Sequence, residues 1–566
     1  MSWNELAHFL MRRTIGSVSD PVNAPFRRIL ENVRQAFPQP VSDRKHDAYV
    51  AFTVLRALDE LDRRKSNLPT LGLPEPVNHG NATDARIAAD PLPLEDVTAQ
   101  LAEFLDGMFL WGHPRSQVNV VPPASVASVI AVLLAAIYNP NLVSEESSLR
   151  VASSEVETAA MVADLVGFDP ERAAGFFTFG GTGATLYGVK LGLEKALPGS
   201  REHGITEKAV LVSSGQSHYA RLSVAGWLGL GEENAIQVRT RLDNAIDLEA
   251  LESCLRKLLE EGRRIACIIA TAGTTDAFGI DNVGAIVEMR DRLAEEYRLD
   301  YRPHVHADAV IGWAWSVFKD YDFERNELGF RPRTVRALAK ACHDLKGLDR
   351  ADSIGVDFHK TGFCPYISTL FLTRDAGDLV LLTRGREKMP YLYQTGEYHP
   401  GLWTLETSRS AAGPLAAWAN LKLLGKNGLR ALLGHLVEMA EVLREELEGR
   451  APTTVLNGNN VGTVTLFRVY PDGIDTFTVK ERERNDPAYR DKLCEHNDYN
   501  RKIFELVHAD AMAGHGVLIS MTDCYRHSTY GEPINALKSY ILSPFADEEN
   551  VRALVDNVIA ARPRVF

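Results

Sequence analysis

The chain has 566 residues, 45% of them hydrophobic and 24% charged, and a formal net charge of −13 at pH 7. This composition is typical of a soluble globular protein, and the length suggests about three or four domains or one large α/β core with additions. Because the net charge is strongly negative, the chain as a whole lacks the basic surface that nucleic-acid binding needs, and we expect no nucleic-acid partner. The six cysteines include no C-x-x-C pair, so the sequence indicates neither a zinc site nor a disulfide framework. We expect reduced thiols in a cytoplasmic protein.

The sequence predicts neither a secretory leader nor a membrane partner. Residues 1–5 do not begin a basic stretch that is followed by a long apolar core. The longest apolar stretch, from Ser125 to Tyr138, is too short to span a bilayer and ends at Asn139 and Pro140. We therefore expect this stretch to form a helix packed into the core.

Residues 1–112 predict a helical segment that precedes the main body of the protein. Apolar side chains recur at helical spacing over 43–65 and again over 94–109. A polar, proline-rich connection from 67 to 90 separates the two stretches.

Residues 113–410 alternate between short apolar runs, such as Ala209–Val212, and helical patterns. Strands that alternate with helices predict one large α/β domain, in which a mostly parallel sheet is covered by helices on both faces. Residues 411–566 begin with a helical pattern, which is followed by strand patterns at 463–469 and 539–542. This last region predicts a small α+β domain.

A glycine-rich stretch, Thr178–Thr185, precedes a helical pattern. Glycines and hydroxyls at the start of a helix can direct several backbone N–H groups at an anion, and glycine permits close approach. The stretch is not a Walker A loop, because no Gly-Lys-Ser/Thr follows, and its spacing differs from the Rossmann fingerprint. A purely structural turn is the alternative.

Two further segments place polar side chains at or just beyond predicted strands. Thr274 follows an apolar strand that ends near Thr271, where ligands of open α/β sheets bind. Asp308 ends another strand, and a buried carboxylate there needs a partner. His304 and His306 share one face of that strand without a third ligand, so we expect no metal.

Lys360 follows Asp357, Phe358 and His359 and leads into the uncharged run 361–366. A lysine in such a place is expected to be buried, which lowers its pKa and makes it a better amine nucleophile. Such lysines bind carbonyl cofactors covalently. The alternative is a lysine whose ammonium reaches the solvent.

The order of these motifs resembles that of the group II decarboxylases that depend on pyridoxal 5′-phosphate (PLP). The series runs from the glycine-rich loop through His218, the Thr-rich strand end and Asp308 to His359-Lys360. The family includes glutamate, aromatic amino-acid and bacterial tyrosine decarboxylases, and the resemblance covers about residues 111–424. It implies the fold-type I PLP-dependent transferase fold, the cofactor PLP, an L-amino-acid substrate and a homodimer with its active site at the interface.

The resemblance also implies roles for individual residues. Lys360 would bind PLP covalently, Asp308 would face its pyridinium nitrogen, and His218 would stack on the ring and polarise the bound substrate. The remaining cofactor contacts would come from Gly181, Thr182 and His359 at the phosphate and from Thr274 near Asp308.

Further roles concern the substrate. Tyr391 resembles the mobile-loop tyrosine that donates a proton to the substrate carbon, and Tyr393 is the alternative. The loop 384–398 around them is polar and contains glycine, as a gating lid should. Asn119 lies in a segment that resembles the substrate-pocket strand, and Lys538 stands where many members place an arginine for the α-carboxylate.

Four residues depart from the family pattern. Gly183 stands where a glutamate is frequent, Val310 where a small alanine is usual, and Phe358 where a proline is frequent. Lys538 in place of arginine can neutralise a carboxylate but loses the bidentate geometry.

The substrate is the least determined part of the resemblance. Asp357 and the run 364–366 are similar to bacterial tyrosine decarboxylases, which slightly favours an aromatic substrate such as tyrosine. His113-Pro114-Arg115 and the polar Gln117 and Asn119 are instead similar to decarboxylases of glutamate and other acidic amino acids. A PLP-dependent carbon–carbon lyase and a catalytically silent paralogue are the remaining alternatives, and intact Lys360 and His218 argue against the silent paralogue.

Overall fold

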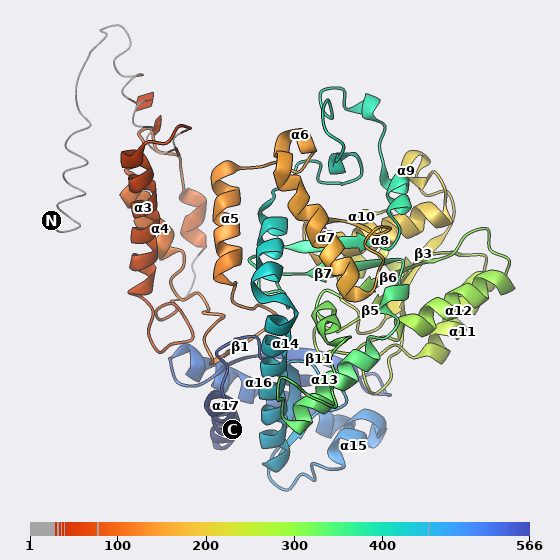
Figure 1. Ribbon diagram of the computed structural model, residues 1–566. Coiled ribbons are helices and arrows are strands. Elements are labelled where there is room, and N and C mark those ends of the chain that lie inside the picture. The colour runs from red at the N-terminus through yellow and green to blue at the C-terminus, as the bar shows by residue number, and fades with distance from the viewer. Residues whose placement is uncertain are drawn as a thin grey trace. The chain divides into compact units, whose positions relative to one another are not determined.

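The computed structural model describes residues 40–75, 79–450 and 452–565, together with isolated positions between 26 and 38 (Figure 1). The chain divides into two compact units, and the boundary lies between Met108 and Phe109. The first unit contains helices α3 (Arg44–Asp62) and α4 (Leu94–Glu103). Helix α3 begins after Asp43, whose side chain accepts a hydrogen bond from the backbone N of Lys45 at 3.0 Å. Within the described residues, no helix combines the length and apolar character needed to cross a membrane.

The second unit contains a seven-stranded sheet in the order β2-β8-β7-β6-β5-β3-β4. Strands β3 to β7 are parallel, whereas β8 runs antiparallel to both of its neighbours. The mostly parallel sheet that the alternating pattern predicts is therefore present. Its strands are β2 (Ala174–Thr178), β3 (Ala209–Ser214), β4 (Ala235–Val238), β5 (Arg264–Thr271), β6 (His304–Asp308), β7 (Ser353–Asp357) and β8 (Thr369–Thr373).

Helices cover both faces of this sheet, which explains why its strands are continuous apolar runs. In β3, Val210 and Val212 pack into the core shared with α7, α11 and α12, while Leu211 packs into the core shared with α8 and α10. Figure 1 shows these helices around the strands. The helices are α7 (Ala152–Val166), α8 (Gly181–Ala196), α9 (Ser200–His203), α10 (Ala220–Trp227), α11 (Leu248–Glu260), α12 (Val283–Glu296) and α13 (Pro332–Asp344).

A second sheet of five strands has the order β1-β11-β12-β10-β9. Strand β1 comes from residues far upstream of the others and pairs in parallel with β11, which ties the start of this unit to its end. The strands are β1 (Ser116–Gln117), β9 (Thr453–Val455), β10 (Val464–Val469), β11 (Leu518–His527) and β12 (Pro533–Tyr540). The helices of this part are α14 (Ala412–Gly449), α15 (Val479–Asn485), α16 (Arg490–Met512) and α17 (Glu548–Ala561).

The apolar stretch 125–138 forms helix α5 (Val126–Tyr138), as its pattern predicts, but only one face of the helix packs into the core. Ala131 and Ala135 are buried, and the helix packs against α14. The other face remains open, and Ile130 and Leu134 are 51% and 49% exposed. The short helix α6 (Glu145–Ser148) follows. A contiguous exposed apolar face of this kind is typical of a surface that binds another protein segment.

Helix α8 approaches the sheet so closely that it requires glycine at one position. A Cβ on Gly192 would lie 2.2 Å from the carbonyl oxygen of Ala266 in β5. Backbone atoms cannot rotate away as a side chain can. We therefore expect Gly192→Ala to lower the free energy of unfolding by about 1–3 kcal/mol, measured as a lower Tm in thermal denaturation.

Gly226 in α10 is the matched control for this prediction, because a Cβ there meets nothing within 4 Å. Gly226→Ala should leave Tm unchanged or raise it, since alanine is the better helix former. Equal melting temperatures for Gly192→Ala and the unmodified protein would contradict the close packing of α8 on β5.

Candidate active site

The predicted site residues meet where three parallel strands end. Asp308, the last residue of β6, pairs in register with Thr271 at the end of β5 and with Gly355 of β7. Lys360 follows β7 by three residues, in a turn. The carboxyl ends of parallel strands are where open α/β sheets bind ligands, because the strand order leaves a crevice there.

Lys360 lies in an ion pair rather than in an apolar pocket. Its Nζ is 2.9 Å from Oδ2 of Asp357, and the two side chains are 16% and 1% exposed. The other carboxylate oxygen of Asp357 accepts a hydrogen bond from Oγ1 of Thr369 at 2.6 Å. Burial lowers the pKa of Lys360, but the charges of Asp357 and Asp308 outweigh burial and raise this pKa overall. The lowered pKa expected from burial alone is therefore wrong, because two carboxylates stabilise the ammonium.

Asp308 is buried and incompletely bonded. Its Oδ1 has no hydrogen-bond partner among the described residues. Burial raises the pKa of Asp308 to about 6, although the charge of Lys360 opposes this rise. A buried carboxylate oxygen without a partner is costly, and a positively charged N–H donor would relieve that cost.

The glycine-rich stretch forms the start of α8. Gly180 has φ +110°, a conformation that favours glycine, and the helix begins at Gly181. A Cβ on Gly181 would lie 3.1 Å from Cγ1 of Val310 and 3.2 Å from Oδ2 of Asp357. Thr182 lies in the first turn of α8, where backbone N–H groups have no partner within the helix. The helix start therefore approaches the Lys360 region closely and can accept an anion.

His359 is buried beside this helix start. The backbone N of Ser368 donates to its Nδ1 at 3.2 Å, and its Nε2 lies 3.5 Å from Oδ2 of Asp357. Burial lowers the pKa of His359 even though Asp357 opposes the shift. The ring is therefore fixed in orientation on the Asp357 side of Lys360.

His218 follows β3 and lies within the electrostatic range of Lys360. Burial, aided by the charge of Lys360, lowers the pKa of His218 to about 4, so the imidazole is neutral at neutral pH. Its Nδ1 accepts a hydrogen bond from the backbone N of Ala220 at 3.1 Å. This hydrogen bond to the first residue of α10 fixes the orientation of the ring.

Thr274 and Asp281 shape the loop that follows β5. Oγ1 of Thr274 accepts a hydrogen bond from the backbone N of Gly279 at 2.8 Å. Asp281 accepts from the backbone N of Ile246 at 2.6 Å and of Thr271 at 2.8 Å. The three hydrogen bonds all run from backbone N–H groups to the side chains of Thr274 and Asp281. They hold the loop after β5 closed.

Lys538 reaches this loop from the second sheet. Its Nζ is 2.8 Å from Oδ1 of Asp276, and Oδ2 of Asp276 accepts from Oγ1 of Thr522 at 3.0 Å. Sequence reasoning gave Asp276 no role, although it closes the Gly273-Thr274-Thr275 run that marks the strand end. Asn119, in contrast, is exposed with φ +49°, and no described hydrogen bond joins it to these residues.

The two tyrosines of the loop 384–398 have different environments. Tyr391 is 78% exposed, whereas Tyr393 is 5% exposed and packs with Val143 and Leu402. The backbone N of Tyr393 donates to Oε1 of Glu146 at 2.7 Å. Tyr393 therefore anchors the loop, whereas most of the Tyr391 side chain is exposed to solvent.

Two departures from the family pattern have a steric explanation. A Cβ on Gly183 would lie 2.5 Å from Oγ1 of Thr178, so a larger side chain does not fit without rearrangement. Phe358 is buried, with ring centroids 4.8 Å from Trp313 and 5.9 Å from Phe177. The aromatic core thus fixes the backbone just before His359 and Lys360.

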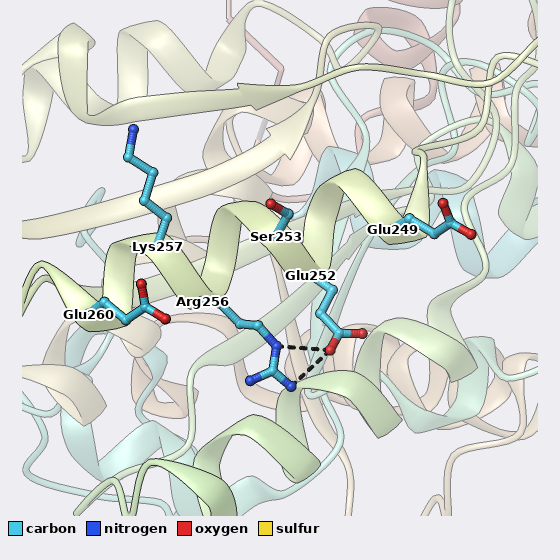
Figure 2. A pocket seen from close by; sticks show the side chains of 6 residues that line it. All are labelled: Glu249, Glu252, Ser253, Arg256, Lys257 and Glu260. Atoms are coloured by element: carbon cyan, nitrogen blue, oxygen red, sulfur yellow. Dashed lines mark hydrogen bonds and ion pairs between the residues drawn. The ribbon is translucent and has the colours of Figure 1, made fainter.

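A hollow on the protein surface is lined by none of the site residues discussed so far. It runs along α11, and Figure 2 shows its six lining side chains, all from that helix. Glu252 accepts a hydrogen bond from Nε of Arg256 at 3.0 Å. The lining residues are exposed or half-buried and are typical of a solvated helix surface, so we assign no function to this hollow.

Comparison with known proteins places this geometry in a family. A family model described as the pyridoxal-dependent decarboxylase conserved domain matches residues 76–319 and 334–469. An L-2,4-diaminobutyrate decarboxylase of Acinetobacter baumannii is 26% identical over 479 residues, which cover 82% of each chain. An L-tyrosine decarboxylase of Enterococcus faecium is 24% identical over 408 residues, covering 60% of this chain and 63% of the relative.

One solved structure has a fold similar to that of this chain. It is the glutamate decarboxylase domain of diaminobutyrate-pyruvate transaminase and L-2,4-diaminobutyrate decarboxylase from Vibrio parahaemolyticus. It has a TM-score of 0.71 and 19% identity and covers 95% of this chain and 100% of its own. The expected fold-type I architecture is thereby confirmed. The chain belongs to the pyridoxal-dependent decarboxylase family and is a PLP-dependent amino-acid decarboxylase.

Proposed function

We propose that the residues around Lys360 form the active site, and that they remove the α-carboxylate of an L-amino acid to give an amine and carbon dioxide. The observation that carries this proposal is the ion pair of Lys360 with Asp357, within the electrostatic influence of Asp308, whose Oδ1 has no hydrogen-bond partner in the described part of the chain. Lys360 is then the residue that binds PLP. When bound, PLP supplies the electron sink for breaking the bond between Cα and the carboxylate.

The residues present fit the cofactor. The free Oδ1 of Asp308 suits a protonated ring nitrogen, because that N–H would satisfy a buried acceptor. The start of α8 at Gly181 and Thr182 suits the phosphate, with His359 beside it. His218 would cover the ring as a neutral imidazole, and Thr274 would keep the loop after β5 in place.

The proton donor to the substrate carbon is proposed to be Tyr391. Its side chain is 78% exposed and can move with the loop, whereas Tyr393 is held by Glu146 and by apolar packing. A donor on a mobile loop fits a site that must admit the substrate and then exclude water. Tyr393 would serve as the anchor of that loop.

Two classes of substrate side chain remain candidates. An aromatic side chain, as the sequence slightly favours, has support in the tyrosine decarboxylase relative. A short diamino acid has support in the L-2,4-diaminobutyrate decarboxylase relative, and a carboxylate near the site, Asp276, favours it specifically. In either case Lys538 would bind the α-carboxylate, and Asn119 would contribute to the pocket.

We also propose that the protein is a homodimer. The open face of α5 is apolar, and in a dimer a second copy of the chain would cover it. Its members are all at least 38% exposed: Val126, Val129, Ile130, Leu133, Leu134, Ile137 and Tyr138. A cytoplasmic location stays a prediction, for which the six free cysteines are the support.

Replacing Lys360 with alanine tests the cofactor assignment. We expect Lys360→Ala to lose the visible absorbance of the PLP-loaded protein and all carbon dioxide release, because the amine that binds the cofactor is gone. Lys346→Ala, at an exposed lysine, is the control and should keep both properties. Full visible absorbance in Lys360→Ala would assign the cofactor to another lysine.

Replacing Tyr391 with phenylalanine tests the proton donor. We expect the amine yield of Tyr391→Phe to fall at least tenfold, with carbonyl side products in its place, because removal of the general acid typically costs about 10²–10⁴ in rate. Amine and carbonyl products would be quantified by chromatography. Tyr393→Phe is the comparison and should keep the product ratio. An unchanged amine yield in Tyr391→Phe would move the role elsewhere.

The double variant Ile130→Asp/Leu134→Asp tests the dimer. Two buried, unpaired charges would destabilise an apolar interface strongly, so we expect the mass in sedimentation equilibrium to fall from two chains to one. Ser253→Asp, on an exposed position of α11, should stay dimeric. A dimer that survives the double variant would place the interface on another surface.

A further inference from the structure

Asp276 and Lys538 form an ion pair that joins the two sheets of the second unit. The pair links the loop after β5 to strand β12 across 262 positions of the sequence. Lys538 is 7% exposed and Asp276 is 33% exposed, so the ammonium is covered and the carboxylate is partly open. Thr522 donates to the second oxygen of Asp276. The positive charge that would bind an α-carboxylate is thus already neutralised.

The pair lies near the proposed reaction centre. Asp276 stands five residues beyond Thr271, which pairs in register with Asp308. The negative charge of Asp276 acts on His218 and opposes the lowering of its pKa by burial. The bond from the backbone N of Gly279 to Thr274 holds the loop that carries Asp276.

The charges of the pair decide which substrate it can accept. Lys538 and Asp276 together are neutral, so an added α-carboxylate leaves the group with one excess negative charge. An aromatic side chain does not correct this excess, and an acidic side chain doubles it. A side chain that ends in an ammonium restores neutrality, which matters because unpaired charges at partly buried sites are costly.

We propose that Asp276 is a specificity-determining residue that binds the side-chain ammonium of a short diamino acid, while Lys538 takes its α-carboxylate. The substrate replaces one internal ion pair by two ion pairs of its own. Because the two ends of the internal pair are adjacent, the substrate charges must also be close, which favours a side chain of few carbons. This inference rests on the proposed decarboxylation at Lys360 and names the substrate class of that site.

Asp276→Asn tests the inference with two substrates of equal shape. L-2,4-Diaminobutyrate carries the ammonium, and L-norvaline has a methyl group in its place. The PLP-loaded protein should decarboxylate diaminobutyrate with the higher kcat/KM. In Asp276→Asn we expect kcat/KM for diaminobutyrate to fall about 10- to 100-fold, as for loss of a charged hydrogen bond, and kcat/KM for norvaline to stay constant or rise.

Two further variants complete the design. Asp320→Asn removes an exposed carboxylate that pairs with Lys426 and should change neither value. Asp276→Glu keeps the charge but moves it one methylene closer to the substrate. We expect it to shift the preference toward the shorter L-2,3-diaminopropionate, and this shift tests the proposal even if Asp276→Asn does not fold.

The possible outcomes distinguish the role of Asp276 in substrate specificity from the proposed decarboxylation at Lys360. An equal loss for diaminobutyrate and norvaline in Asp276→Asn would reduce Asp276 to a structural partner of Lys538 and overturn the inference. Amine from tyrosine but none from diaminobutyrate in the unmodified protein would also overturn it, while leaving the proposed decarboxylation intact. No amine from any L-amino acid would overturn both.

Discussion

The ion pair between Lys360 and Asp357 is the interaction on which the proposed site depends. Lys360 follows the end of β7 by three residues, and its ammonium is held 2.9 Å from the carboxylate of Asp357, which is 1% exposed. Removing one partner from a buried pair leaves an uncompensated charge and typically costs about 3–5 kcal/mol. Asp308 on the next strand adds a second carboxylate, one oxygen of which has no hydrogen-bond partner among the residues that the structure describes. The group therefore combines one cation with two carboxylates that both stabilise it, before any ligand binds.

The fold produces this pattern from simple requirements. A parallel sheet covered on both faces brings the carboxyl ends of β5, β6 and β7 to one edge. Helix α8 begins at that edge because Gly181 allows its first turn to approach Val310 and Asp357. The second sheet contributes Lys538, which pairs with the loop after β5. Residues from both sheets thus surround the region where a cofactor and a substrate would meet.

Some of these features could be predicted from the sequence and others could not. Asp308 and Lys360 follow apolar runs, and the meeting of parallel strand ends explains why such residues come together. The pKa of Lys360 was misjudged because burial was considered without Asp357. The pairing of Asp276 with Lys538 joins two separate sheets, which local patterns do not reveal. The prediction of a helix over 125–138 is confirmed by α5. Apolar residues lie all around this helix, so the sequence does not indicate which of its faces stays exposed.

The central claim is that Lys360 is the residue that binds PLP. Reduction of the PLP-loaded protein with sodium borohydride fixes the cofactor to its lysine, and peptide mapping by mass spectrometry then identifies that residue. We expect the reduced cofactor on the peptide that contains Lys360 and on no other lysine-containing peptide. Its attachment to a different lysine would contradict the account of the site.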